Sequence, residues 1–118
     1  MNKTELSQRT KKFALRVMRL AEALPKGRSG NAIASQIVRS GTSVASNYRA
    51  ALRGRSRAEF ISKANVVLEE ADETLLWLEL VEEGGLLKPA LISSLKKEAD
   101  ELVAIFTATL KSARGNKS

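Results

Sequence analysis

Carboxylates and hydroxyls cluster at two places in the sequence where an enzyme would need them. Residues 69–73 include four acids, and Ser40 and Ser43 lie three positions apart. The chain has no histidine and no cysteine, so it lacks the usual base for a serine nucleophile and the usual companion ligands of a carboxylate metal site. Consecutive acids on a helix also point in different directions instead of converging on one ion. We therefore predict a protein that is not an enzyme and that holds no metal or cofactor.

Positive charge forms the stronger pattern. The net charge is +7, but residues 1–58 carry +11 and residues 59–118 carry −4. Such asymmetry favours a polyanionic partner such as RNA or DNA, although cations near the ends of helices also complement the helix dipole. Aromatic residues make up 4% of the chain, so few side chains could stack on bases and we expect weak sequence specificity. The residues predicted to bind nucleic acid are Arg49, Arg53, Arg55, Arg57, Lys11, Lys12 and Lys63.

A stripe of polar residues recurs every three or four positions from Gln36 to Asn47, which places it on one side of a helix. A helical hairpin turning at residues 54–56 would set Arg39 opposite the acids of 70–73 and Gln36 opposite Thr74. An arginine–carboxylate pair there would fix the register of the two helices. The predicted structural network consists of Gln36, Arg39, Ser43, Asn47, Glu69 and Glu73.

Long helices are needed to position these residues, and the composition supplies them. Two prolines and seven glycines interrupt a chain rich in Ala, Leu, Glu, Lys and Arg, which are strong helix formers. The spacing of apolar residues and the breaks near Pro25, Gly54 and Gly84 predict helices over about 4–24, 29–53, 57–83 and 89–113. The predicted fold class is all-α: a single domain of residues 1–118 that forms an antiparallel up-down-up-down four-helix bundle.

Local signals at the helix ends and along the faces complete this prediction. We expect Ser29 to cap the second helix, and Ser56 with Glu59 to form a capping box at the third. On the fourth helix we expect Leu91 to lie on the apolar side with Leu95.

The predicted topology gathers positive charge at one end of the bundle. The start of the first helix, the loop between the second and third, and the end of the fourth share that end. The basic residues expected there are Lys3, Arg9, Lys11, Lys12, Arg49, Arg53, Arg55, Arg57, Lys63, Lys111, Arg114 and Lys117. The N-terminal residues are charged and no apolar run approaches the ~18 residues of a membrane span, so we expect a cytoplasmic protein that is not bound to a membrane.

Short motifs in a fixed order give the chain a family resemblance. They are Leu24-Pro25, Gln36-Ile37-Val38-Arg39-Ser40, Ser43-Val44, Asn47-Tyr48-Arg49-Ala50-Ala51, Arg53, Ser56-x-x-Glu59-Phe60 and the run from Glu69 to Leu80. Over about residues 13–87 the chain resembles bacterial four-helix bundle proteins, including those encoded in intervening sequences of large-subunit ribosomal RNA genes. The resemblance implies a ring-like homopentamer. It also implies a relation to the accessory protein of diversity-generating retroelements, which binds nucleic acid and a reverse transcriptase through a basic surface.

Two functions are consistent with these patterns. The first is a non-enzymatic homo-oligomer that binds RNA or other nucleic acid through its basic end. The alternative is a protein–protein interaction scaffold or adapter, in which the basic half of one subunit meets the acidic third helix of the next subunit or of another protein. Small residues along the second helix leave room for a neighbouring helix, and Trp77 and Leu80 are expected contacts.

Overall fold

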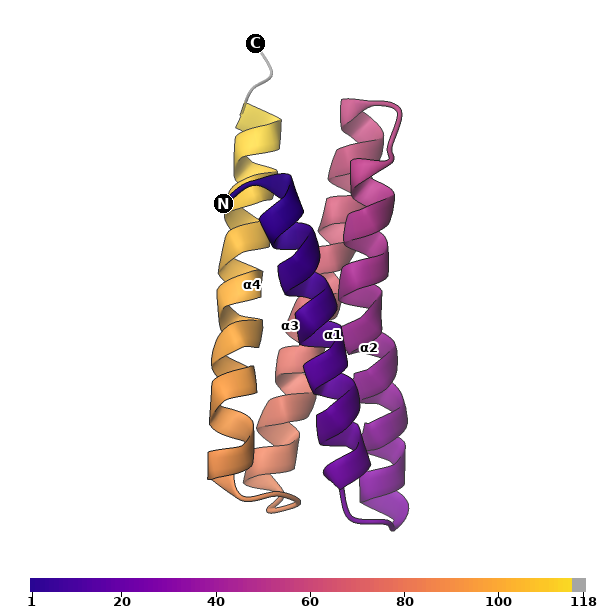
Figure 1. Cartoon of the computed structure of the whole chain (residues 1–118), viewed down its shortest axis with the longest axis vertical. Helices are drawn as coiled ribbons and strands as arrows, with labels where there is room; N and C mark the ends of the chain where they lie inside the picture. Colours follow the sequence, from indigo (N-terminus) through magenta and orange to yellow (C-terminus); the bar gives the residue numbers. More distant parts are fainter. Residues whose placement is uncertain (116–118) are drawn as a thin grey trace.

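The computed structural model describes residues 1–115 and contains four helices (Figure 1). They are α1 (Lys3–Ala23), α2 (Arg28–Leu52), α3 (Arg57–Glu83) and α4 (Pro89–Gly115). The ends of each helix lie within two residues of the ranges expected from the sequence. Lys117, which the sequence places at the basic end, lies outside the described residues.

The helices form an antiparallel bundle in which each packs against the next along the chain, and α1 also contacts α4. The seam between α1 and α4 is the least closely packed of the four. Residues 1–115 contain no strand, and the molecule measures 51 × 21 × 20 Å. The prediction of an all-α four-helix bundle is confirmed.

The core is filled by aliphatic side chains and a few rings that recur at three- and four-residue spacing on each helix. Phe13 and Phe106 are buried, and the Tyr48 ring meets Phe106 edge to face with centroids 5.3 Å apart. The expected place of Leu91 is wrong: it is 62% exposed, and Ile92 is buried instead. With apolar residues gathered on the inner faces, no helix of the described chain is long and apolar enough to cross a membrane.

A glycine brings α1 and α2 into close contact. A Cβ atom at Gly41 would lie 2.7 Å from a methyl carbon of Val17, which is fully buried on α1. The absence of a side chain at this position therefore permits the close approach of the two helices.

The N-cap of α2 is Gly27, not Ser29 as expected. The helix begins earlier because the backbone N–H of Asn31 donates to the carbonyl of Gly27 at 2.9 Å, which places Ser29 inside the first turn. Gly30 is buried at this point, where a Cβ atom would overlap the carbonyl oxygen of Pro25. The turn after α1 thus folds back tightly onto the start of α2.

Candidate nucleic-acid interface

The start of α1, the α2–α3 loop and the end of α4 lie at the same end of the bundle (Figure 1). The loop is held on both sides. The backbone N–H of Arg53 bonds to the carbonyls of Arg49 and Ala50, each at 3.2 Å, and closes α2. The Ser56 hydroxyl accepts from the backbone N–H of Glu59 at 3.1 Å, which caps α3. The Glu59 carboxylate accepts from the N–H of Arg55 at 2.8 Å, so this half of the expected capping box forms one residue earlier.

The side chains predicted to bind nucleic acid are exposed at or near this end. Arg49, Arg53 and Arg55 form no ion pair within residues 1–115. Arg57 has an interaction partner and is not free. The predicted lysines are exposed as well and likewise form no ion pair in the described chain; they are Lys11, Lys12 and Lys63. We call the seven residues Arg49, Arg53, Arg55, Arg57, Lys11, Lys12 and Lys63 the basic pole.

Arg9 does not join this set of cations, although the sequence placed it there. Its Nε and Nη2 atoms donate to the two oxygens of Glu98 at 2.7 and 2.8 Å, and Nη2 also reaches Glu101 at 2.7 Å. The hydrogen bond to Glu98 is the main cause that raises the pKa of Arg9 above its ordinary value. Arg9 therefore ties α1 to α4 across the loosest seam of the bundle, and its charge is already neutralised.

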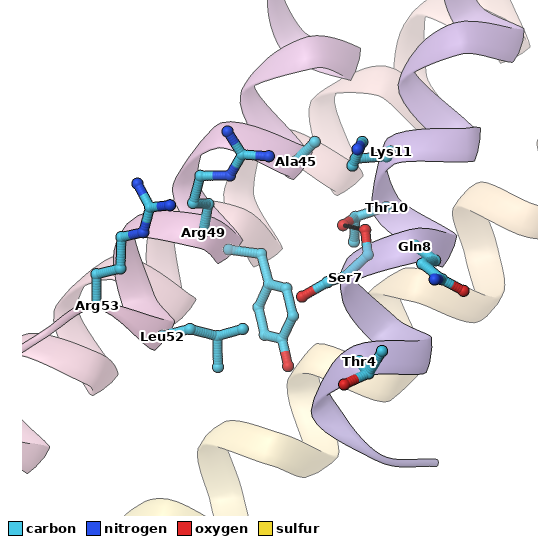
Figure 2. Close-up of a pocket in the computed structure, with 10 residues that line it drawn as sticks. Thr4, Ser7, Gln8, Thr10, Lys11, Ala45, Arg49, Leu52 and Arg53 are labelled. Atoms are coloured by element: carbon cyan, nitrogen blue, oxygen red, sulfur yellow. Dashed lines mark hydrogen bonds between the residues drawn. The ribbon is translucent and has the colours of Figure 1, made fainter.

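A pocket between α1 and α2 opens beside the basic pole (Figure 2). Arg49 and Arg53 stand on the α2 wall, and Thr4, Ser7 and Gln8 stand on the α1 wall. Lys11, Thr10, Ala45, Tyr48 and Leu52 complete the lining. Thr4, Ser7 and Gln8 were not predicted from the sequence, although their spacing with Lys11 places all four on one face of a helix.

The polar network between α2 and α3 differs from the predicted one. Arg39 donates to Glu70 at 3.1 Å and to Glu73, and the Gln36 side chain accepts from Arg39 at 3.3 Å. Trp77, which the sequence assigned to a neighbouring subunit, donates its indole N–H to Glu73 at 3.1 Å. Glu70 and Trp77 are thus members that the sequence analysis missed.

Three predicted members of the network make other contacts. Asn47 donates to the backbone carbonyl of Ser43 at 2.9 Å, so this contact stays within α2. Glu69 is exposed and accepts from Asn65 on its own helix at 3.4 Å. Glu69 lies on the outer side of α3, because an i+1 step on a helix turns a side chain by about 100° from its neighbour.

Arg39 meets Glu70 and Glu73 as the expected hairpin placed it, but the partner of Thr74 lies one helical turn from the expected one. The buried hydroxyl of Thr74 bonds to the Ser40 hydroxyl at 2.8 Å, whereas the hairpin turn expected at 54–56 placed Gln36 opposite Thr74. Both hydroxyls also bond to carbonyls of their own helices, at 3.4 Å for Ser40 and 2.8 Å for Thr74. Both buried polar groups are thereby satisfied.

Comparison with known proteins identifies the family. The model of the 23S rRNA-intervening sequence protein family matches residues 2–108, a longer stretch than the 13–87 of the motifs. The chain belongs to this family. A crystal structure from Bacteroides thetaiotaomicron, a protein of unknown function from the S23 ribosomal protein family, superposes with a TM-score of 0.86 at 32% identity. The alignment covers 94% of this chain and 99% of that one. No curated protein matches the sequence.

In this member of the 23S rRNA-intervening sequence protein family, the surroundings of Glu73 shift the pKa of its carboxyl. Partial burial raises the pKa of the Glu73 carboxyl, but hydrogen bonds from Trp77 and Arg39 outweigh burial and hold the pKa below its ordinary value of 4.5. The folded state therefore prefers the ionised carboxylate more strongly than the unfolded state does. Its contribution to stability is complete above the unfolded pKa and is lost as the pH falls through the folded pKa.

The single tryptophan makes this titration measurable. We expect Trp77 fluorescence to change with a midpoint below pH 4.5, because protonation of Glu73 breaks the carboxylate–indole hydrogen bond. In Glu73→Gln the transition should disappear, and the difference in melting temperature between wild type and variant should shrink as the pH falls through the midpoint. Far-UV circular dichroism confirms that the bundle stays folded during the titration. A fluorescence midpoint at or above pH 4.5 would contradict the prediction.

The acids of this family member are spread along the bundle. Within residues 1–115 no three carboxylates lie close enough together to hold a metal ion. Glu70, Glu73, Glu82, Glu98 and Glu101 each pair with a cation. These acids act as partners for Arg and Lys in the packing of the bundle.

Proposed function

We propose that this protein is a non-enzymatic, homo-oligomeric RNA-binding protein whose basic pole contacts phosphates. The observation that carries the proposal is the grouping, within residues 1–115, of arginines without an ion pair at the end of α2 and in the loop that follows it. Arg9, Arg39 and Lys96 along the body of the bundle are paired with carboxylates, the last with Glu82 at 2.6 Å. Arg49 in the last turn of α2, Arg53 at its C-cap and Arg55 in the loop form no such pair within residues 1–115.

Unpaired arginines at a helix end and in the loop that follows it are suited to a phosphate backbone. Guanidinium groups donate two hydrogen bonds to one phosphate, and each neutralised phosphate releases counterions from the strand. The family name associates its members with 23S rRNA, which is a polyanion of this kind. The single tryptophan and single tyrosine are packed in the bundle, so contacts to phosphates would dominate contacts to bases.

An apolar stripe on α3 supports assembly into an oligomer, which the family resemblance suggests is a pentamer. Leu76 and Leu80 lie one turn apart and are 47% and 40% exposed. Apolar side chains of this size gain free energy when a second subunit covers them. In a ring, each subunit would add its basic pole to a shared surface, and the avidity for one RNA strand would rise with their number.

The same stripe favours the second candidate, a protein interaction scaffold. Asp72 and Glu69 are exposed on α3 beside Leu76, so the helix presents acids next to apolar groups. The basic half of another subunit or of another protein would complement such a surface. In this case the arginines of the basic pole would serve contacts between proteins.

Titration against labelled RNA at several salt concentrations decides between these functions. Five to seven phosphate contacts predict a slope of log K against log salt of roughly −3 to −5 for a single strand. Light scattering on the same sample gives the mass of the assembly. A slope near zero, or binding that disappears near a physiological ~0.15 M salt, would contradict RNA binding and favour the scaffold.

A further inference from the structure

Three cations converge on the pocket between α1 and α2 from opposite walls. Lys11 comes from α1, and Arg49 and Arg53 come from α2 (Figure 2). Among residues 1–115, no carboxylate lines this pocket. Glu5, the acid in the first turn of α1, accepts from the backbone N–H of Asn2 at 3.2 Å and belongs to the cap of that helix.

Complementing a helix dipole explains part of this arrangement. Arg49 lies in the last turn of α2 and Arg53 is its C-cap residue, so both cations meet the negative end of that dipole. Lys11 lies in the first half of its own helix, so it does not complement the C-terminus of α1. Gathering it with two arginines raises the repulsion between like charges, and an anion in the groove would remove that repulsion.

The pocket continues into a second one along the same two helices. The two pockets have cavity volumes of about 340 and 310 Å³, and both are lined by Lys11, Ala45 and Arg49. Each is roughly ten times the ~30 Å³ that one water molecule occupies in the liquid, so a phosphate alone would fill neither. In Figure 2, Lys11 and Arg49 flank Ala45 at the junction.

The linings of the two pockets are suited to nucleosides. Beyond the cations, the first offers the polar groups of Thr4, Ser7 and Gln8 above Leu52. The second is lined by Ala14 and by Leu15, which is 50% exposed, with Thr42 and Ser46 as the hydroxyl groups. Hydroxyls beside apolar surface match a sugar that carries a base. The cations shared by both pockets lie where a phosphate joining two nucleosides would be.

We infer that the α1–α2 groove binds one dinucleotide step of a single-stranded nucleic acid, with the linking phosphate between Lys11 and Arg49 and one nucleoside in each pocket. The inference rests on the proposed function and gives it a defined site. Base pairing holds the bases inside a duplex, so a strand must be unpaired to turn two bases into these pockets, and the groove selects single strands over duplexes.

Binding of a fluorescein-labelled RNA hexamer tests the inference. One set of variants removes a positive charge from the groove, and another fills the groove without changing its charge. Lys11→Gln and Arg49→Gln should each weaken binding about tenfold, as expected for a charge-assisted bond to phosphate. Ala45→Trp keeps the charge and fills the junction of the pockets, and it should weaken binding to a similar extent. The matched controls are Lys26→Gln, an exposed lysine at the other end of the bundle, and Ala32→Trp, an exposed alanine on α2, and both should bind like wild type.

The outcomes distinguish the groove from the proposed function. The two charge variants could weaken hexamer binding while Ala45→Trp leaves it unchanged. This result would overturn the dinucleotide site in the groove but not RNA binding by the basic pole. Equal affinity for the hexamer and for an RNA hairpin with a fully paired stem would also overturn the dinucleotide site. If wild type binds no RNA even at low salt, both proposals fail. Circular dichroism melting of Ala45→Trp shows whether the larger side chain leaves the bundle folded.

Discussion

Replacing Arg49, Arg53 and Arg55 together with glutamine should weaken the binding of single-stranded RNA about fifty-fold at ~0.15 M salt. Each phosphate contact contributes about 0.7 to the log–log salt slope, so three lost contacts reduce its magnitude by about two units. At this salt concentration, two units of slope correspond to the stated loss of affinity. All three side chains are exposed and form no ion pair in the described chain, so stability should change by less than about 0.5 kcal/mol for each.

A charge-matched control separates the basic pole from net charge. Lys26, Arg28 and Lys88 are exposed at the opposite end of the bundle. Changing them to glutamine also lowers the net charge of +7 by three, as the first triple variant does. Fluorescence anisotropy at four salt concentrations measures both triple variants. Equal losses in the two would mean that RNA responds to overall charge, and the basic pole would lose its assigned role. Arg57 is kept in both because it already has an interaction partner.

The architecture could be predicted because its signals are local. Glycines and prolines mark the loops, and apolar spacing marks the helices, so the helix ends came within two residues. For Leu91 and Ile92, local signals are not sufficient to predict which residue is buried. Both are apolar and adjacent, so the pattern does not distinguish them, and only the packing of the first turn of α4 decides that Ile92 is buried.

The site was harder to predict from the sequence than the fold, because it depends on how the helices pack against each other. The cations of the α2–α3 loop are adjacent in the sequence and were found. The bridge from Arg9 to Glu98 joins residues 89 positions apart, and no local pattern reveals it. The α1–α2 groove is lined by residues of two helices, and the sequence shows Gly41, where these helices approach closely, only as one more small residue.

The largest effect on stability is expected at Phe106. Phe106→Ala should lower the free energy of unfolding by about 3–5 kcal/mol, since the ring is fully buried and its removal leaves a cavity. Tyr48 lines the α1–α2 pocket and rests edge-on against Phe106, so the pocket floor should loosen as well. Urea denaturation followed by circular dichroism measures the change, at one protein concentration because an oligomer is stabilised by mass action.

Two other substitutions define what the Phe106 result means. Phe106→Leu keeps most of the volume and should cost about 1.5 kcal/mol or less. Leu91→Ala removes an apolar side chain that is 62% exposed, and it should cost less than about 0.5 kcal/mol. A loss at Leu91 as large as that at Phe106 would mean that another subunit covers the start of α4. The comparison therefore tests the core of the monomer and locates any subunit contact at Leu91.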